Sequence, residues 1–268
     1  MKHRATILLT ACVNPGGMSY TVLQDPELRK RQYCEALDFY LQNTSLPVVF
    51  MENTHTDFSS EYQDWIDRGR LEYLTFDGNS GFDKIKGKGY GEALMLLYAL
   101  EHSRMLAESK YLIKITGRLK VENVEEIGRS RWLLLDKLWR SNIENQEWIT
   151  TTCFCTTPAI LRELLLRHKE EISEEDRGHN WIENVFARAF VTDTDIPMRI
   201  VPFFASPVFH ANSGTSNSPY PIKSDFINAT DNIHELVGLL RRRHQPLAAC
   251  CWQLVFYAYM LRHKLKAE

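Results

Sequence analysis

Six short apolar segments rich in β-branched and aromatic residues recur along the chain. They read ATILLTACV, LPVVFMEN, LEYLTFD, YLIKITG, EWITTTCFC and MRIVPFFA. Segments of this length and composition predict β-strands. Helical patterns lie between most of them, so the sequence predicts an α/β fold with a mainly parallel central sheet flanked by helices.

Three helices are predicted between these strands. The first covers 25–42, with Pro26 in its first turn, where proline is well tolerated. The second covers 91–108, and the third begins at Pro158 and ends near His168. In the first helix, the positions at helical spacing are Leu28, Tyr33, Leu37, Tyr40 and Leu41.

The 268 residues are predicted to form one large domain with an added helical segment. Residues 1–225 would hold the sheet and its ligand site, and 226–268 would form a C-terminal helical extension packed on the same domain. Between them, the segment 206–224 is rich in Ser, Gly, Asn and Pro and is typical of a long loop.

Composition excludes some classes of protein. A hydrophobic content of 44%, a charged content of 25% and a formal net charge of -2 give no general affinity for nucleic acid. The six cysteines contain no CxxC pair, which argues against a zinc site and favours reduced thiols in a reducing, cytoplasmic compartment.

Both ends of the chain carry apolar segments with two interpretations. KHR followed by ATILLTAC resembles a signal peptide, but an apolar run opening into Asn-Pro-Gly-Gly is also how a buried strand meets its loop, and we expect the strand. Near the other end, the apolar segment 247–261 has basic residues on both sides. It is too short to span a bilayer and suits either a docking helix or a helix at the inner face of the membrane.

In an open parallel sheet, ligands bind outside the carboxyl ends of the strands. This rule singles out residues 10–17, 52–57, 77–91 and 116–120. The third of these segments contains FDGNSGFDKIKGKGYGEAL, a basic glycine-rich loop that leads into a helix and predicts an anion cradle. Its glycine spacing fits neither the dinucleotide fingerprint nor the Walker loop, and a flexible loop without a ligand stays open.

The stretch YLIKITGR places cations near the end of a buried strand. If the strand persists, Lys114, Thr116 and Arg118 lie on one face. A buried lysine needs an acidic partner or an anionic ligand, so a purely structural ion pair is the alternative to a binding role. Gly117 allows the backbone to pass close to a neighbour or a ligand.

The order of these elements resembles the nucleotide-sugar-binding half of the GT-A glycosyltransferases. FMENTHTD matches the strand whose end holds the base or ribose, 84–99 matches the loop and helix along the nucleotide, and 111–117 matches the strand that ends in an Asp-x-Asp metal site. KGKGYGEAL followed by YLIKITGR is similar to bacterial proteins of surface-polysaccharide synthesis. The resemblance covers 5–215 and implies that donor contacts come from Thr10, Asn14, Glu52, Asn53, Lys84, Lys88, Gly89, Lys114, Thr116 and Gly117.

One element departs from the family pattern. Where two carboxylates would hold a divalent metal, this chain has Ile115, Thr116, Gly117 and Arg118. Lysine or arginine can stabilise a departing nucleoside diphosphate in place of a metal. We therefore expect a metal-independent transferase without a cofactor, in which Arg118 is catalytic and Lys88 and Lys114 lie near the phosphates.

The resemblance also implies a carboxylate that takes the proton of the acceptor hydroxyl. Within EEDRGHNWIENVFARAF, Glu183 matches its position best, with Glu175 and Asp176 as competitors. A solvated charge cluster at a helix start is the alternative. Acceptor contacts are expected from His179, Trp181, His210 and Ser213, although Trp181 also suits packing and a lone loop histidine is usually exposed.

The resulting hypothesis is sugar transfer from a nucleotide sugar to a glycan or lipid-linked acceptor. A nucleotidyltransferase on a similar sheet is one alternative, although the loop 14–17 after the first strand has no cation close in sequence. A non-catalytic nucleotide-binding or scaffold protein is the other, and the missing Asp-x-Asp is its best support.

Overall fold

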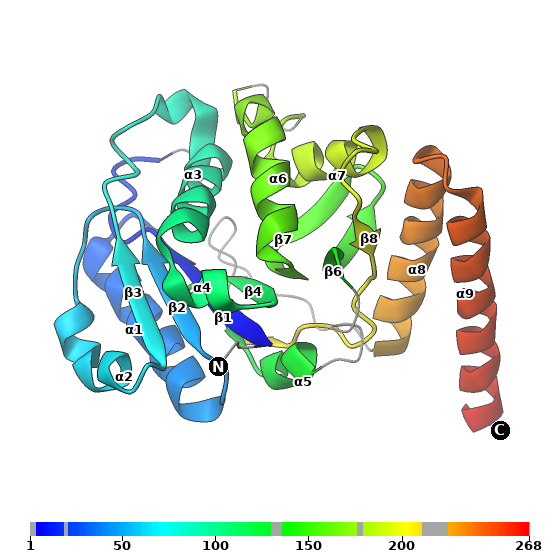
Figure 1. The fold of residues 1–268 in the computed structure, drawn as a ribbon, viewed down its shortest axis with the longest axis horizontal. Helices are drawn as coiled ribbons and strands as arrows, with labels where there is room; N and C mark the ends of the chain where they lie inside the picture. The colour runs from blue at the N-terminus through cyan, green and yellow to red at the C-terminus, as the bar shows by residue number, and fades with distance from the viewer. Residues whose placement is uncertain (1–3, 19–20, 130–135, 176–178, 211–224, 268) are drawn as a thin grey trace.

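The computed structural model describes residues 4–18, 21–129, 136–175, 179–210 and 225–267. In the described part of the chain, seven strands form one sheet in the order β3-β2-β1-β4-β7-β6-β8, and β5 and β9 pair separately (Figure 1). The strands are β1 (Ala5–Ala11), β2 (Val48–Glu52), β3 (Leu71–Thr75), β4 (Tyr111–Thr116), β5 (Lys120–Val121), β6 (Leu138–Asn145), β7 (Trp148–Thr156), β8 (Arg199–Ile200) and β9 (Phe209–His210).

The sheet is mixed but mostly parallel. Strand β1 pairs in parallel with β2 and β4, β2 with β3, and β6 with β8, whereas β7 runs antiparallel to both β4 and β6. The α/β fold expected from the sequence is therefore confirmed. The chain leaves β1 toward β2 and β3 and returns to β4 on its other side, so the strand order reverses between β1 and β4.

Two strand predictions differ from the structure. Strand β6 was not expected, because Arg140, Ser141 and Asn142 interrupt its apolar pattern. The segment MRIVPFFA was expected as a full strand but contributes only the two residues of β8. Pro202 follows closely, and proline has no N–H to extend a ladder of hydrogen bonds.

The helices begin and end where local chemistry favours it. Asp25 caps the first helix by accepting from the backbone N–H groups of Glu27 and Leu28, and Ser103 divides the expected second helix in two by capping α4. The helices are α1 (Pro26–Asn43), α2 (Gln63–Asp67), α3 (Gly87–His102), α4 (Arg104–Glu108), α5 (Val124–Arg129), α6 (Pro158–His168), α7 (Ile182–Thr192), α8 (Asp225–Arg242) and α9 (Pro246–Ala267).

Side-chain alternation along the strands separates two hydrophobic cores. Ile7 and Leu9 of β1 pack with α1 and α5 on one face of the sheet. Leu8 points to the other face, which α3, α6 and α7 cover (Figure 1). Lys114 and Thr116 of β4 lie in register with Leu8 and Thr10, so they belong to the α3 face, as the alternation predicted.

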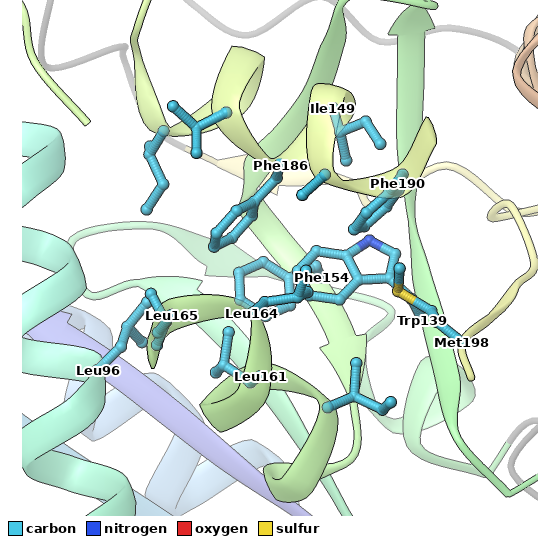
Figure 2. Close-up of a cluster of buried hydrophobic side chains, with 14 of the residues drawn as sticks. Leu96, Trp139, Ile149, Phe154, Leu161, Leu164, Leu165, Phe186, Phe190 and Met198 are labelled. Carbon is cyan, nitrogen blue, oxygen red and sulfur yellow. The ribbon is translucent and has the colours of Figure 1, made fainter. Parts of the chain in front are cut away.

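An aromatic cluster joins α6 and α7 to the strands β6 and β7 (Figure 2). Trp139 stacks on Phe154 with ring centroids 4.5 Å apart, and the edges of Phe186 and Phe190 pack against it at 5.6 and 5.0 Å. Phe186 and Phe190 come from α7, so this packing fixes the position of the helix whose first turn carries Glu183.

Helices α8 and α9 form a pair at one end of the molecule, with α9 outermost (Figure 1). Helix α8 packs on β6, where Asn232 accepts a hydrogen bond from the backbone N–H of Ile143 at 2.6 Å, and Ile233 and Leu236 join the core on the α3 face. None of the helices in the described ranges is long and apolar enough to cross a bilayer.

Candidate functional site

A pocket of ≈ 230 Å³ opens at the carboxyl ends of β1 and β4, where the strand order reverses. This is the place at which open α/β sheets usually bind ligands. We call it the switch-point pocket. Its lining includes Thr10, Arg29, Tyr33, Asn53, Lys88, Gly89, Glu92, Thr116, Arg118, Thr151, Glu174, Trp181 and Glu183. Of the predicted donor residues, it thus brings together Thr10, Asn53, Lys88, Gly89 and Thr116.

Lys114 lies beneath this pocket and not in it. Its side chain is fully buried, and its ammonium group pairs with Glu92 and donates to the carbonyl of Thr151 at 2.8 Å. Glu92 also accepts from the hydroxyl of Thr10 at 3.3 Å. The alternative of a structural ion pair is therefore the correct one for Lys114, and the expectation that it contacts the ligand is wrong.

Arg118 lies at the pocket because β4 stops at Thr116. Gly117 turns the chain, and its N–H donates to the carbonyl oxygen of Thr10 at 2.8 Å. A Cβ atom at Gly117 would lie 2.6 Å from that oxygen, so only glycine allows the two backbone segments to pack this closely. The N–H of Gly117 is already hydrogen-bonded and is not available to a nucleotide-sugar ligand. The chain therefore does not keep Arg118 in the strand alternation that the sequence suggested.

The guanidinium group of Arg118 is only partly satisfied. One terminal N–H donates to the side-chain oxygen of Gln32 in α1 at 3.1 Å. Its Nε–H is buried and has no hydrogen-bond partner among the described residues. An unpaired buried donor is costly, and an anion in the pocket would satisfy it.

The glycine-rich start of α3 already holds an anion that the chain itself provides. Glu174 is buried there and accepts from the N–H of Gly89 at 3.1 Å, and a Cβ atom at Gly87 would overlap its side chain. Burial raises the pKa of Glu174. The expectation of an open anion cradle is therefore wrong, because the glycines make room for Glu174.

The three lysines of this loop have separate roles. Lys84 donates to the carbonyl of Gly16 at 2.6 Å, and Lys86 pairs with Glu170 at 2.8 Å, so neither is directed at the pocket. Lys88 lines the pocket, with its ammonium group 5.2 Å from the ring centre of Trp181. Of these three lysines, Lys88 is thus the one that lines the pocket.

Two neighbouring residues at the end of β2 have different roles: Glu52 is structural, and Asn53 is a candidate for ligand binding. Glu52 is fully buried, and its carboxylate accepts from groups of three loops and strands, so it holds the site's walls and does not reach a ligand. These donors are the backbone N–H groups of Val13, Thr54 and Thr56 and the hydroxyl of Thr75. Asn53 lines the pocket, and no described group pairs with its buried amide oxygen. Asn14 is exposed and accepts from Gly16 N–H at 3.1 Å, so it shapes the turn after β1.

Glu183 enters the pocket from the first turn of α7. It accepts a hydrogen bond from the hydroxyl of Thr151 at 2.6 Å. Burial raises the pKa of Glu183, and the hydrogen bond from Thr151 offsets this only in part. Its competitor Glu175 is exposed and outside the pocket lining, and Asp176 lies outside the described residues.

Of the predicted acceptor residues, only Trp181 is found in the lining of the pocket among the described side chains. Trp181 lines the pocket and packs near Trp148, with ring centroids 5.9 Å apart. His179 is exposed and is not part of the lining, so the structure does not bring it to this pocket. Ser213 and the side chain of His210 lie outside the part of the chain that is described.

Sequence reasoning missed two pairs of pocket residues. Arg29 donates to the carbonyl of Cys12 at 2.7 Å and to the hydroxyl of Tyr33 at 2.9 Å, and both side chains line the pocket. Glu92 and Thr151 were missed as partners of Lys114. The requirement that a buried lysine have a carboxylate partner was the available signal for Glu92, the first acid after the glycine loop.

A second pocket of ≈ 780 Å³ adjoins the first, since Thr152 lines both. Its walls come from β6, β7, α8 and α9, together with Phe209 of β9 and with Ser206 and Pro207. They carry amides, carboxylates and aromatic rings, including Asn145, Glu144, Phe209, Glu235 and Phe256. Across the residues described, no group of three or more His, Cys, Asp or Glu side chains is arranged to hold a metal ion.

No protein-family model and no curated protein matches this sequence. Among solved structures, the glycosyltransferase GlyE of Streptococcus pneumoniae TIGR4 is similar with a TM-score of 0.42 at 9% identity, over 75% of this chain and 45% of that one. This chain thus spans less than half the length of GlyE.

Two further solved structures are similar at the same level. A glycosyltransferase involved in the glycosylation of the major capsid of PBCV-1 has a TM-score of 0.38 at 11% identity, over 74% of this chain and 81% of that one. A cytidylyltransferase from Leptospira borgpetersenii serovar Hardjo-bovis has a TM-score of 0.37 at 10% identity, over 75% and 76%. These values assign no function, which has to come from the site.

Proposed function

We propose that this protein is a GT-A-like glycosyltransferase whose nucleotide-sugar donor binds in the switch-point pocket. One observation carries the proposal: the unpartnered Nε–H of Arg118 and the carboxylate of Glu183 line the same pocket at the reversal of strand order. A cation on one wall suits a diphosphate, and a carboxylate of raised pKa on another suits proton transfer.

In the proposed reaction, Glu183 is the base. The acceptor hydroxyl attacks the anomeric carbon of the donor sugar, its proton passes to the Glu183 carboxylate, and the bond from that carbon to the diphosphate oxygen breaks. The leaving nucleoside diphosphate gains negative charge, which Arg118 and Lys88 stabilise. The amide of Asn53 is placed to contact the base or ribose of the nucleotide.

Lys114 has an indirect role in this proposal. Glu92 lines the pocket, and its negative charge would repel the donor diphosphate if it were unpaired. The ion pair with Lys114 neutralises that charge. Lys114 is therefore a positioning residue. Of the three side chains expected to replace the metal, only Arg118 and Lys88 keep that role in the proposal.

The second pocket is the proposed acceptor site. Amides and carboxylates bind sugar hydroxyls, and aromatic faces pack on sugar rings. Because Thr152 lines both pockets, a glycan there would reach the donor sugar. We propose surface-polysaccharide synthesis in the cytoplasm as the setting of this reaction. Glu235 lines the acceptor pocket, so Glu235→Gln is expected to raise the KM for the acceptor without changing the affinity for the nucleotide.

A calorimetric titration with UDP, GDP, CDP and CMP, each with and without added manganese, tests the donor site. We expect one preferred nucleoside diphosphate and an affinity that manganese does not change. Failure of all four to bind would support a non-catalytic scaffold, and binding or turnover that requires manganese would contradict metal independence.

A nucleotidyltransferase stays as the second candidate because of Lys84. The ammonium group of Lys84 lies 2.6 Å from the carbonyl of Gly16, so a cation does accompany the loop after β1. Release of pyrophosphate from a nucleoside triphosphate, with no transfer from a nucleotide sugar, would favour this candidate over a glycosyltransferase.

A further inference from the structure

Helix α9 is apolar on nearly all sides, although the protein covers only one of them. Between Leu247 and Leu261 it has no charged residue. Its inner side packs on α8 and on the rest of the fold through Ala249, Trp252 and Phe256. A helix that is apolar all round is normally buried on all sides. Here the other side is uncovered by any described element.

The uncovered side concentrates the protein's exposed apolar surface. Of nine large hydrophobic side chains that are exposed in the described residues, five lie on α9. Leu247, Leu254 and Leu261 are 83%, 64% and 60% exposed, and their spacing of seven puts them on one face. We call this surface the α9 outer face. It comprises Leu247, Cys251, Leu254, Tyr257, Ala258 and Leu261.

Charge distinguishes the possible occupants of this face. Helix α9 contains no Asp or Glu, and basic residues lie at both of its ends. Arg241 and Arg242 precede it and are exposed, and the sequence RHKLK follows its apolar part. Asp231 and Glu235 of α8 line the second pocket together with Phe256, which lies on the inner side of α9.

A second copy of the chain fits these features poorly. Pairing two α9 helices would bring basic ends together in either direction, and no carboxylate of α9 would compensate them. A helix of 22 residues is about 33 Å long and ~10 Å wide, so it buries on the order of 300 Å² per partner. Stable interfaces bury about 800 Å² per partner.

We propose that the α9 outer face binds the surface of a bilayer that contains anionic lipids. The apolar side chains enter the boundary between headgroups and acyl chains, and the basic residues at both ends of the helix contact lipid phosphates. The helix lies in the plane of the membrane and does not span it. This inference does not depend on the proposed glycosyl transfer, because it rests on α9 and the basic end of α8.

Flotation with vesicles tests the proposal on the full-length protein. Vesicles of phosphatidylcholine with about 30% phosphatidylglycerol are expected to carry the protein, whereas pure phosphatidylcholine carries much less. Raising the salt from about 0.1 M to about 0.5 M weakens the binding, because the contribution of the basic ends is screened. Equal recovery with both lipid compositions would overturn the anionic requirement.

A matched pair of double variants locates the contact. Leu254→Glu with Leu261→Glu changes exposed residues, so the fold is expected to persist, but vesicle binding falls by about tenfold or more. The control, Leu166→Glu with Ile227→Glu, changes side chains that are 48% and 50% exposed on α6 and α8. The control variant is expected to bind vesicles at the wild-type level. Equal loss in both variants would overturn the assignment to α9.

Two further readings separate a membrane from a second copy. An environment-sensitive fluorophore on Cys250, in a Cys251→Ser background, is expected to shift its emission to the blue with anionic vesicles only. Light scattering after size-exclusion chromatography is expected to give a monomer. A dimer that Leu254→Glu with Leu261→Glu dissociates, together with no vesicle binding, would replace the membrane by a second copy.

Discussion

Two cations of the segment YLIKITGR lie four residues apart and have opposite surroundings. Lys114 is fully buried in β4, and the chain supplies its partners, Glu92 and the Thr151 carbonyl. Arg118 lies beyond the end of the strand, at the pocket, and one of its donors has no partner among the described residues. The buried cation therefore has a stabilising role, and the one at the rim is the candidate for ligand binding.

The difference depends on a single turn of backbone. As long as β4 continues, Lys114 and Thr116 are held on the α3 face of the sheet, where the fold has to provide a partner for a buried charge. After Gly117 the chain leaves the sheet, and Arg118 faces a pocket that an external anion can enter. Charge alone does not identify a binding residue, whereas incomplete pairing at a pocket does.

Replacing Lys114 by Met would break the buried side of this comparison. Glu92 would keep its charge without a partner, so we expect a loss of about 3–5 kcal/mol in the free energy of unfolding. Urea denaturation measures it. Adding Glu92→Gln removes the unpaired charge and is expected to restore most of the stability. If Lys114→Met alone is as stable as the wild type, the ion pair has no structural role.

Replacing Glu183 by Gln tests the proposed base in the same pocket as Arg118. Glutamine keeps an oxygen for the Thr151 hydroxyl but cannot take a proton, so turnover is expected to fall by about a hundredfold or more. Glu175→Gln is the control, because Glu175 is exposed and outside the pocket. Equal rates for Glu183→Gln and the wild type would remove Glu183 from the reaction.

The pH dependence of turnover sharpens the assignment. A base works only when it is ionised, so the rate is expected to rise with pH through the pKa of Glu183. Burial raises that pKa from its ordinary value of 4.5, and the midpoint of the rise therefore lies above 4.5. A profile of kcat against pH with its midpoint at or below 4.5 would contradict a buried base.

Glu174 gives the smallest expected effect, and it is measured as a change in stability with pH. Its pKa is raised in the folded protein, so its contribution to stability is complete below 4.5 and is lost as the pH rises through the folded pKa. Glu174→Gln removes this loss. As the pH rises from about 4 to about 8, the melting temperature should fall less steeply for Glu174→Gln than for the control Glu175→Gln, which keeps Glu174. Parallel curves would show that burial of Glu174 has no energetic cost.

The local signals in the sequence predicted much of the fold. Short apolar runs rich in β-branched and aromatic residues located strands β1 to β4 and β7, most of which are buried. Helical spacing of apolar residues and a proline at the helix start located α1 and α6. Strand β6 was missed because Arg140, Ser141 and Asn142 hide its pattern, and its burial comes from packing against β7, α7 and α8. Tertiary contacts of this kind leave no periodic signal.

The site was predictable only in part. The rule on strand ends depends on topology, and it selected Thr10, Asn53, Lys88 and Arg118, which line the switch-point pocket. It could not tell that Glu174, distant in sequence, would occupy the helix start, or that Glu52 would hold loops. Which charge pairs with which is decided by contacts between distant segments.

The central claim is that Arg118 holds the donor's phosphates, and nucleotide affinity measures this directly. Calorimetry on Arg118→Ala, with Arg162→Ala on α6 as the matched control, compares a pocket arginine with one that is 53% exposed on the surface. We predict that Arg118→Ala weakens the preferred nucleoside diphosphate by at least about tenfold, with an unchanged melting temperature and no change in the control. Equal affinity in Arg118→Ala and the wild type would contradict the account.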